Sequence, residues 1–392
     1  MSEPARRLLA QLARGLAAEE ARGRRRHLTP RAGLDLSSND VLGLAEDPWV
    51  AARVAEAVQR HGTGAGAARL LRGNLALFEQ AEARLAAASG REAALLFPSG
   101  YMASQALLAT LLRVGGSWAS DRDNHACIVD GLRLGRQAEG RVGRLDDPTD
   151  PCWAFPEGAP FPRLAVVESV VSTSGRMPDL ASIAACAEEA GAVLLVDEAH
   201  ATGLWGAASG PAQATPSGRV AALGLTSRVL ATMHTGGKAL GVAGAWVAGE
   251  RVLIEHLVQH ARPFIFTTAP MPALAAGLLA ALERLATLPG AGEEVRAKAG
   301  RLRTRLREAG VDCGGDGTHL VPVPMGSEAR ALEVAGRLQA EGFDVRALRP
   351  PTVPVGGSCL RVVVRRVLAD EDLERFATRL AHHAHATAAG TA

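Results

Sequence analysis

Short apolar runs alternate with helical patterns through the middle of the chain. The runs are AALLF (93–97), GSWASD (116–121), RLAVVESV (163–170), AVLLVD (192–197), RVLATM (228–233) and GAWVAG (244–249). Between them lie stretches with apolar residues at helical spacing, such as YMASQALLATLLRVG and LASIAACAEEAG. Strands that are almost continuously apolar and alternate with helices are typical of a parallel sheet covered on both faces. The pattern therefore predicts an α/β fold with a mostly parallel central sheet.

The two ends of the chain have different patterns. Residues 1 to about 27 form a predicted amphipathic helix, and Asp47 and Pro48 are the cap and first residue expected at the start of another helix. After Pro289 and Gly290, helical patterns mix with the apolar runs HLVPVPMG and LRVVVR, and the tail HHAHATAAGTA is expected to fray with surface histidines. We expect an N-terminal helix and arm (1–45), a large domain (46–285) and a smaller α+β domain (286–392).

Composition narrows the class of protein. With 392 residues, 47% of them hydrophobic, the chain is long enough for one large domain and a smaller one. The net charge of +2 gives no reason to expect nucleic acid or a membrane surface as a partner. Five scattered cysteines without a CxxC pair argue against a disulfide framework or a zinc site and favour a reducing compartment. No apolar run reaches the roughly 18 residues of a membrane span, so we expect a cytoplasmic protein.

Lysine is scarce in this chain. Of 43 Lys and Arg residues only Lys238 and Lys298 are lysines. Lys298 lies in an Arg-rich amphipathic stretch, where a solvated cation is expected. Lys238 lies in the glycine-rich segment ATMHTGGKALGVAG. Arg cannot lose its proton near neutral pH or form a Schiff base, whereas a buried Lys amine can do both. We therefore expect the chemistry of the protein to depend on Lys238.

Other polar residues follow the ends of the predicted strands: Ser99 and Gly100, Asp121, Glu168 to Ser172, Asp197 and His200. In open α/β sheets ligands bind outside the carboxyl ends of the strands, so these groups should meet Lys238 in one crevice. Each alone has an ordinary explanation. Asp197 can cap a helix, His200 can be a structural histidine, and Ser172 can bond its local backbone. Their order along the chain favours a shared site.

The set provides what a pyridoxal phosphate site needs. Such a site uses a lysine for covalent attachment, a carboxylate for the pyridinium nitrogen and a donor near the phenolic oxygen. It also uses an aromatic lid, and backbone N–H groups at a helix start with a hydroxyl for the phosphate. The candidates, in that order, are Lys238, Asp197, His200, His125, the helix start at Gly100 and Tyr101, and Thr235.

With these residues in place, the chain resembles the α-oxoamine synthase family of pyridoxal-phosphate-dependent acyl-CoA transferases, which have the aspartate aminotransferase fold (type I). The matching motifs run in order from residue 36 to residue 272: LSSNDVLGL, GTGAGAARLLRGN, LLFPSGYMASQA, SDRDNHACIVDG, VVESVVSTSG, VDEAHATGLWG, HTGGKALGVAGAW and ARPFIFTTAPMP. The segment RPPTVPVGGSCLRV (349–362) resembles the C-terminal segment of the family member of biotin synthesis.

The resemblance implies a role for each matching residue. Lys238 would carry the cofactor, Asp197 would hold the pyridine nitrogen, and His200 and Ser172 would contact the phenolic oxygen. His125 would stack on the ring and assist as an acid. The phosphate would be held by Gly100, Tyr101 and Thr235, with Thr267 or Thr268 reaching the phosphate of a neighbouring subunit in a homodimer. The substrate would be bound by Arg361, Arg24 and Thr352. The implied reaction is the decarboxylative condensation of L-alanine with pimeloyl-CoA or a pimeloyl carrier-protein thioester.

Four positions depart from the family pattern: Phe78, Cys127, Ser174 and Arg176 stand where histidine, serine and two acids are frequent. None of them removes a group that the chemistry requires. Relatives using glycine or serine stay open as alternatives: 2-amino-3-ketobutyrate CoA ligase, 5-aminolevulinate synthase and serine palmitoyltransferase, or an acyltransferase of secondary metabolism. So does a non-catalytic pyridoxal phosphate protein.

A nucleic-acid motor is a further alternative, because DEAH at 197–200 is also a helicase motif. Such a motor needs a GxxxxGK[ST] loop, and here Ala239 follows the only Gly-Lys pair, which leaves no hydroxyl for magnesium.

Overall fold

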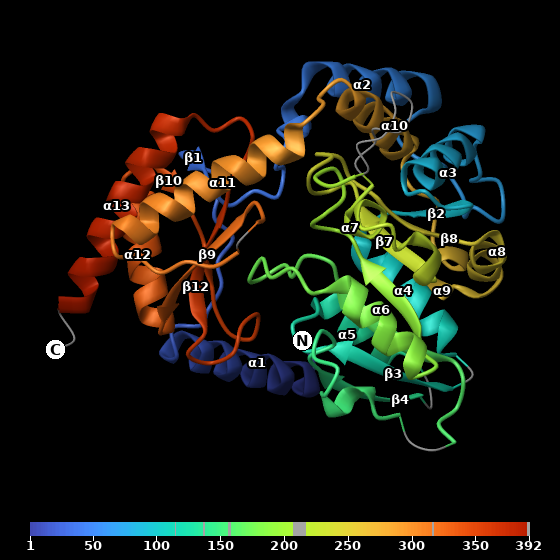
Figure 1. The fold of residues 1–392 in the computed structure, drawn as a ribbon, viewed down its shortest axis with the longest axis horizontal. Helices are drawn as coiled ribbons and strands as arrows, with labels where there is room; N and C mark the ends of the chain where they lie inside the picture. The colour runs from blue at the N-terminus through green and yellow to red at the C-terminus, as the bar shows by residue number, and fades with distance from the viewer. Residues whose placement is uncertain (114, 136–137, 156–157, 207–216, 316, 390–392) are drawn as a thin grey trace.

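The computed structural model describes residues 1–113, 115–135, 138–155, 158–206, 217–315 and 317–389. Its centre is a seven-stranded sheet in the order β2-β8-β7-β6-β5-β3-β4 (Figure 1). The strands are β2 (Ala93–Phe97), β3 (Gly116–Asp121), β4 (Ala138–Gly143), β5 (Arg163–Glu168), β6 (Val193–Asp197), β7 (Ala231–Thr235) and β8 (Ala245–Gly249). Strands β3 to β7 pair in parallel, whereas β8 is antiparallel to both β7 and β2. The predicted α/β fold is confirmed.

Helices cover both faces of this sheet. Alternate residues of β5 show the two faces, since Leu164 and Val166 pack with α4 (Gly100–Leu111), α5 (Ala126–Arg133) and α8 (Arg251–His260). Ala165 and Val167 pack on the other side with α6 (Leu180–Glu189). Also on the large body lie α2 (Pro48–His61), α3 (Ala76–Ala88), α7 (Arg219–Ala222), α9 (Arg262–Ile265) and α10 (Pro272–Ala286). As predicted, Asp47 caps α2, accepting hydrogen bonds from the backbone N–H groups of Trp49 and Val50.

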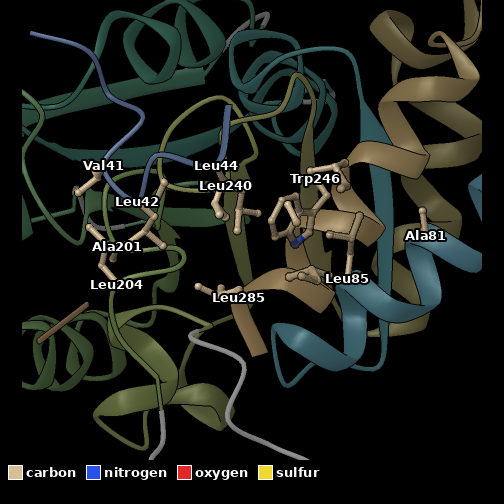
Figure 2. Close-up of a cluster of buried hydrophobic side chains, with 14 of the residues drawn as sticks. Val41, Leu42, Leu44, Ala81, Leu85, Ala201, Leu204, Leu240, Trp246 and Leu285 are labelled. Atoms are coloured by element: carbon tan, nitrogen blue, oxygen red, sulfur yellow. The ribbon is translucent and has the colours of Figure 1, made fainter. Parts of the chain in front are cut away.

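One buried cluster joins segments far apart in the sequence (Figure 2). Val41, Leu42 and Leu44 of the N-terminal arm pack against the loops that follow β6 and Lys238 and against α3, β8 and α10. Figure 2 labels the partners Ala201, Leu204, Leu240, Leu85, Trp246 and Leu285. This packing fixes the arm over the carboxyl ends of β6 and β7, where the candidate residues lie.

The C-terminal part has its own sheet and core. Strands β9 (Leu320–Gly326), β11 (Ala347–Leu348) and β12 (Ser358–Val363) form a sheet in the order β11-β12-β9. Helices α11 (Ala291–Glu308), α12 (Glu328–Ala340) and α13 (Asp370–Ala389) pack with it. The short β1 (Leu34–Asp35) pairs with β10 (Phe343–Asp344), and Leu36 lies in the same core. The three-part domain division stays a prediction.

Two expectations about this part were wrong. Lys298 is only 8% exposed, and its amine donates to the carbonyl oxygens of Arg366 (2.9 Å) and Leu368 (2.6 Å), which replace water around the charge. As far as Ala389 the tail is helical rather than frayed, because α13 continues to that residue, and residues 390–392 lie outside the described part of the chain. His383 is buried against Glu341 at 2.8 Å, and His385 lies 2.8 Å from the carbonyl oxygen of Ala309. These contacts hold the helix to its neighbours.

The N-terminal helix α1 (Glu3–Ala21) has no buried residue. Its exposed apolar side chains are Leu8, Leu9, Leu12 and Leu16. Within the described part of the chain, no single helix has the length and apolar character needed to cross a membrane. Helices α10 and α11 meet such a criterion only together, with a bend of 77° between them.

Candidate active site

A tight turn places Lys238 just after β7. Gly236 N–H donates to the Gly244 carbonyl (2.8 Å), and Gly241 N–H donates to the Lys238 carbonyl (2.9 Å). Gly241 has φ +66°, and a Cβ there would lie 2.2 Å from the backbone nitrogen of Ala45. Glycine is therefore needed at position 241, because the arm residues Leu44 and Ala45 press against this turn.

The environment of Lys238 favours a neutral amine. Burial lowers the pKa of Lys238 below its ordinary value, although the carboxylates of Asp197 and Glu168 oppose the shift. The positive charge of Arg361 acts in the same direction as burial. An amine that loses its proton more readily than an exposed lysine can act as a nucleophile and as a base.

Two buried carboxylates lie side by side at the ends of neighbouring strands. Asp197 on β6 is directly opposite Glu168 on β5 in the parallel register. Burial raises the pKa of Asp197, and it raises the pKa of Glu168 to about 8, with the negative charge of Asp197 acting in the same direction. Glu168 accepts a hydrogen bond from Ser172 N–H through one oxygen (2.9 Å), but its other oxygen is buried without a partner.

His125 lies at the N-cap of α5 with its tautomer determined by the backbone. Its Nδ1 accepts a hydrogen bond from Cys127 N–H (3.2 Å), so the ring proton of the neutral form lies on Nε2. Burial lowers the pKa of His125, and the charge of Lys238 acts in the same direction. Burial also raises the pKa of Cys127 to about 12, which keeps the residue a thiol.

Asn124 holds this loop against the neighbouring strand. Its amide nitrogen donates to the carbonyl of Val166 (2.7 Å) and to the Ser120 hydroxyl (2.9 Å), while its oxygen accepts from Glu168 N–H (3.0 Å). One side chain thus ties His125 to the strand that ends in Glu168. From its position at a strand end Glu168 was expected in the crevice, but no chemical role was predicted for it, and Asn124 was not predicted as a site residue.

The start of α4 lies beside Thr235. Ser99 caps the helix through Met102 N–H (3.3 Å), and the position of a Cβ on Gly100 would be 3.8 Å from Thr235. The helix start and the Thr235 hydroxyl are therefore neighbours, as a phosphate would require. The Tyr101 hydroxyl donates to Asp130.

His200 and Arg361 approach Lys238 from two different parts of the chain. His200 follows β6 and is 4% exposed, with Nδ1 buried and unpaired. Burial lowers the pKa of His200 well below its ordinary value, and Lys238 adds to the shift. Arg361 on β12 donates to the Ser172 carbonyl (2.9 Å) and to the Asn39 side chain (3.1 Å). The C-terminal sheet thus contributes a guanidinium to a site on the central sheet.

Comparison with known proteins places the chain in a family. Residues 31–380 match the model of the aminotransferase class I and II family. The chain belongs to this family. An 8-amino-7-oxononanoate synthase of Anaeromyxobacter dehalogenans (strain 2CP-1) is 42% identical over 379 residues, which cover 93% of each chain. One of Halorhodospira halophila is 43% identical over 350 residues, covering 88% of this chain and 84% of the relative.

Solved structures agree on the fold. A Sphingomonas wittichii serine palmitoyltransferase has a TM-score of 0.84 at 26% identity, covering 92% of this chain and 89% of its own. An 8-amino-7-oxononanoate synthase of Francisella tularensis has a TM-score of 0.77 at 21% identity, covering 91% of this chain and 98% of its own. The predicted type I fold and the resemblance to α-oxoamine synthases, which are pyridoxal-phosphate-dependent acyltransferases, are confirmed.

The predicted roles of four further residues, Arg24, Thr352, Thr267 and Thr268, stay predictions. Arg24 is held by both oxygens of Glu328 (2.7 to 3.0 Å), and Thr352 lines a cavity of about 570 Å³ with Arg25, Arg26 and Arg349. The structure thus places Arg24 and Thr352 between the end of α1 and the C-terminal sheet. Thr267 and Thr268 lie between α9 and α10. Their predicted contact concerns a neighbouring subunit and stays a prediction.

One departure from the family pattern has a structural explanation. Arg176, which replaces an acid, bonds Asp121 (2.7 Å) and Asp146 (2.5 Å) and lies 3.5 Å from Asp123. Three carboxylates therefore surround the positive charge that Arg176 introduces.

Proposed function

We propose that this protein is an 8-amino-7-oxononanoate synthase. It would condense L-alanine with pimeloyl-CoA, or with the corresponding carrier-protein thioester, and release 8-amino-7-oxononanoate, CoA and carbon dioxide. The observation that supports the chemistry is the Lys238 amine of lowered pKa beside two buried carboxylates and Arg361. The substrate assignment is supported by relatives of 41 to 43% identity that bear this name.

The residues fit pyridoxal phosphate. Buried polar atoms of Glu168 and His200 lack partners, and the start of α4 offers N–H groups beside Thr235, so a polar anionic ligand completes the site. Asp197 would hold the pyridine nitrogen, His200 and Ser172 the phenolic oxygen, and His125 would cover the ring. Gly100, Tyr101 and Thr235 would hold the phosphate, and Lys238 would attach covalently. When bound, the cofactor supplies an electron sink for negative charge at the substrate Cα.

Lys238 and Arg361 would handle the amino acid. The guanidinium of Arg361 would bind the alanine carboxylate, exchanging its bonds to the Ser172 carbonyl and Asn39 for a charge-assisted pair. The Lys238 amine would take the proton from Cα, and burial favours this role because it lowers the pKa of the amine and so favours the free base that the step requires.

His125 would act on the thioester. Since Nδ1 accepts the Cys127 N–H, Nε2 carries the proton and would donate a hydrogen bond to the thioester carbonyl oxygen as the new carbon–carbon bond forms. The thiolate of CoA leaves, and the carboxyl group from alanine is then lost as carbon dioxide. Lys238 would return a proton to the product.

A comparison of three amino acids tests the proposed substrate. Purified protein loaded with pyridoxal phosphate is given L-alanine, glycine or L-serine with pimeloyl-CoA, and thiol release is followed. We expect release with L-alanine and its loss in Lys238→Ala. Release with glycine or serine but not with alanine would contradict the substrate and leave the family assignment in place. L-Serine is included because a serine palmitoyltransferase is among the structural neighbours.

We further propose a cytoplasmic homodimer. The apolar stripe Leu8, Leu12 and Leu16 on α1 and the exposed Phe266 beside Thr267 offer surface that a second copy would bury. Sedimentation velocity would test the assembly, and a monomer at micromolar concentration would contradict it.

A further inference from the structure

His319, just before β9, is a buried histidine that the proposed reaction does not use. It is 1% exposed, and within the described part of the chain neither ring nitrogen has a hydrogen-bond partner. A neutral imidazole has one donor and one acceptor, and burying both unpaired is unfavourable. The position therefore requires an explanation other than ordinary core packing.

The ring of His319 lies against that of His200. The two ring centroids are 5.7 Å apart with an angle of 25° between the planes, a stacked arrangement. His200 follows a strand of the central sheet, whereas His319 enters from the C-terminal sheet. The unpaired Nδ1 of His200 lies in the same pair of rings, so three buried nitrogens without partners meet where the two sheets approach each other.

The backbone of His319 is fixed by the strand that carries Arg361. Its carbonyl accepts a hydrogen bond from Val364 N–H (2.9 Å), and in the β12–β9 register Arg361 faces Pro322. His319 and Arg361 therefore reach the crevice from one rigid pair of strands. A shift of these strands would move both side chains together.

The surroundings of His319 keep its ring neutral. The largest charge effects on its pKa come from positive groups: Arg361, Lys238, Arg296 and Arg303. Burial, together with these charges, lowers the pKa of His319 to about 3. A neutral ring packs on His200 without adding a positive charge to the crevice.

We propose that His319 is a positioning residue whose ring stacks on His200 and holds that imidazole against the phenolic oxygen of pyridoxal phosphate. The proposal rests on the cofactor site proposed above. His319 touches His200 rather than the cofactor, so its effect passes through the orientation of the His200 ring.

The test compares His319→Ala with His319→Phe in the loaded protein. The readouts are the pH midpoint of the visible cofactor band and the dissociation constant of pyridoxal phosphate. Alanine removes the stack, so the His200 ring turns and its hydrogen bond to the negative phenolic oxygen weakens. We expect the midpoint in His319→Ala to rise on the order of one pH unit, a tenfold change in the ionisation constant. Phenylalanine keeps a stacking ring, and its midpoint should stay near that of the wild type.

Two outcomes would overturn the proposal. Either His319→Ala keeps the wild-type midpoint and dissociation constant, or His319→Phe shifts them as far as alanine does, which would assign the effect to the ring nitrogens rather than the stack. Thermal unfolding of the cofactor-free variants shows whether each one folds.

Val321→Ala is the matched control, since Val321 lies two residues on in β9 and packs in the C-terminal core away from His200. It should lower stability and leave the midpoint unchanged. An equal shift in this control would mean that general loosening is the cause. A wild type that shows no cofactor band would contradict the proposed function itself, whereas a normal wild-type band with an unresponsive His319→Ala contradicts only the positioning role.

Discussion

Buried polar groups near the ends of β6 and β7 fall into two sets with opposite bonding. In the paired set, Glu198 accepts hydrogen bonds from the Ser169 hydroxyl (2.7 Å) and from the N–H groups of Arg219 (3.0 Å) and Val220 (2.6 Å). His234, also paired, has each ring nitrogen 2.8 Å from a threonine hydroxyl. In the unpaired set, Glu168, His200 and His319 keep buried atoms for which the described residues offer no hydrogen-bond partner.

The difference shows that pairing distinguishes the two sets better than a shifted pKa does. Burial lowers the pKa of both His234 and His319 to about 3, yet only His319 lacks partners. An unpaired buried polar atom costs about 1–3 kcal/mol. A fold tolerates such atoms where a bound molecule completes their bonds, as the proposed cofactor would for Glu168 and His200, while the ring of His319 stacks on that of His200. The paired set stabilises the protein, and the unpaired set lines the crevice around Lys238.

The largest expected effect is at the centre of the unpaired set. Lys238→Ala removes the base and the attachment point, so thiol release should fall by at least about 10²–10⁴-fold, the contribution of a general base. Steady-state kinetics and the visible cofactor band measure it. Lys238→Arg is the control that keeps a positive charge, and retained activity in either variant would disprove the assigned role.

Breaking the paired set should mainly cost stability. Glu198→Ala leaves the Ser169 hydroxyl and two backbone N–H groups unpaired, which should lower the free energy of unfolding by about 3 kcal/mol or more. Denaturant titration of the cofactor-free protein measures this loss. Glu56→Ala on α2 is the exposed control, where only a surface pair with Arg53 is lost and about 0–1 kcal/mol is expected. Equal losses in the two variants would remove the distinction.

The unpaired carboxyl group of Glu168 should make the free energy of unfolding depend on pH. Folded Glu168 has a pKa of about 8 against 4.5 for the free group, so between these values the folded state holds a proton that the unfolded state has released. This group therefore makes stability fall as pH rises through that window, by up to about 1.4 kcal/mol per pH unit. Glu168→Gln should remove this contribution in the cofactor-free protein. Parallel stability curves for variant and wild type between pH 5 and 8 would contradict it.

The smallest expected effect is the difference in stability between phenylalanine variants of His234 and His319. His234→Phe removes the partner of the Thr232 hydroxyl, whereas the Thr202 hydroxyl keeps its bond to the Glu198 carbonyl (2.8 Å). The change should cost about 1–3 kcal/mol in unfolding free energy. His319→Phe removes two unpaired nitrogens and should leave the stability of the cofactor-free protein unchanged or higher. Thermal melts of the two variants side by side decide the matter. A larger loss at His319 than at His234 would reverse the comparison.

A buried strand or helix can be predicted from the sequence when its apolar residues show which of its faces are covered. The strand from Leu164 to Val167 is apolar at every position because both its faces are covered, and its prediction holds. Strand β4 escaped notice because AEGRVG is an exposed edge without an apolar pattern. The convergence of His125, Asp197 and Lys238 followed from strand order, since parallel strands end at one edge.

The contacts between buried polar side chains could not be predicted from the sequence. Burial raises the pKa of Glu168, and the charge of Asp197 adds to the shift because the register of β5 with β6 places the two carboxyl groups opposite each other. The contact of His319 with His200 depends on how the C-terminal sheet approaches the central one. Lys298 showed the same limit, because the carbonyls that bury its amine come from about 70 residues further along the chain. Long-range contacts of single side chains leave no local pattern.

Because the chain has only two lysines, cleavage after lysine can show whether the cofactor is attached to Lys238. A protease that cuts after lysine has two sites, after Lys238 and after Lys298, and would divide the denatured chain into three pieces. Cofactor fixed to Lys238 by reduction would block the first cut and leave residues 1–298 as one fragment. The amount of that fragment relative to the fragment 1–238 would report the occupied fraction of the site, without any assay of turnover.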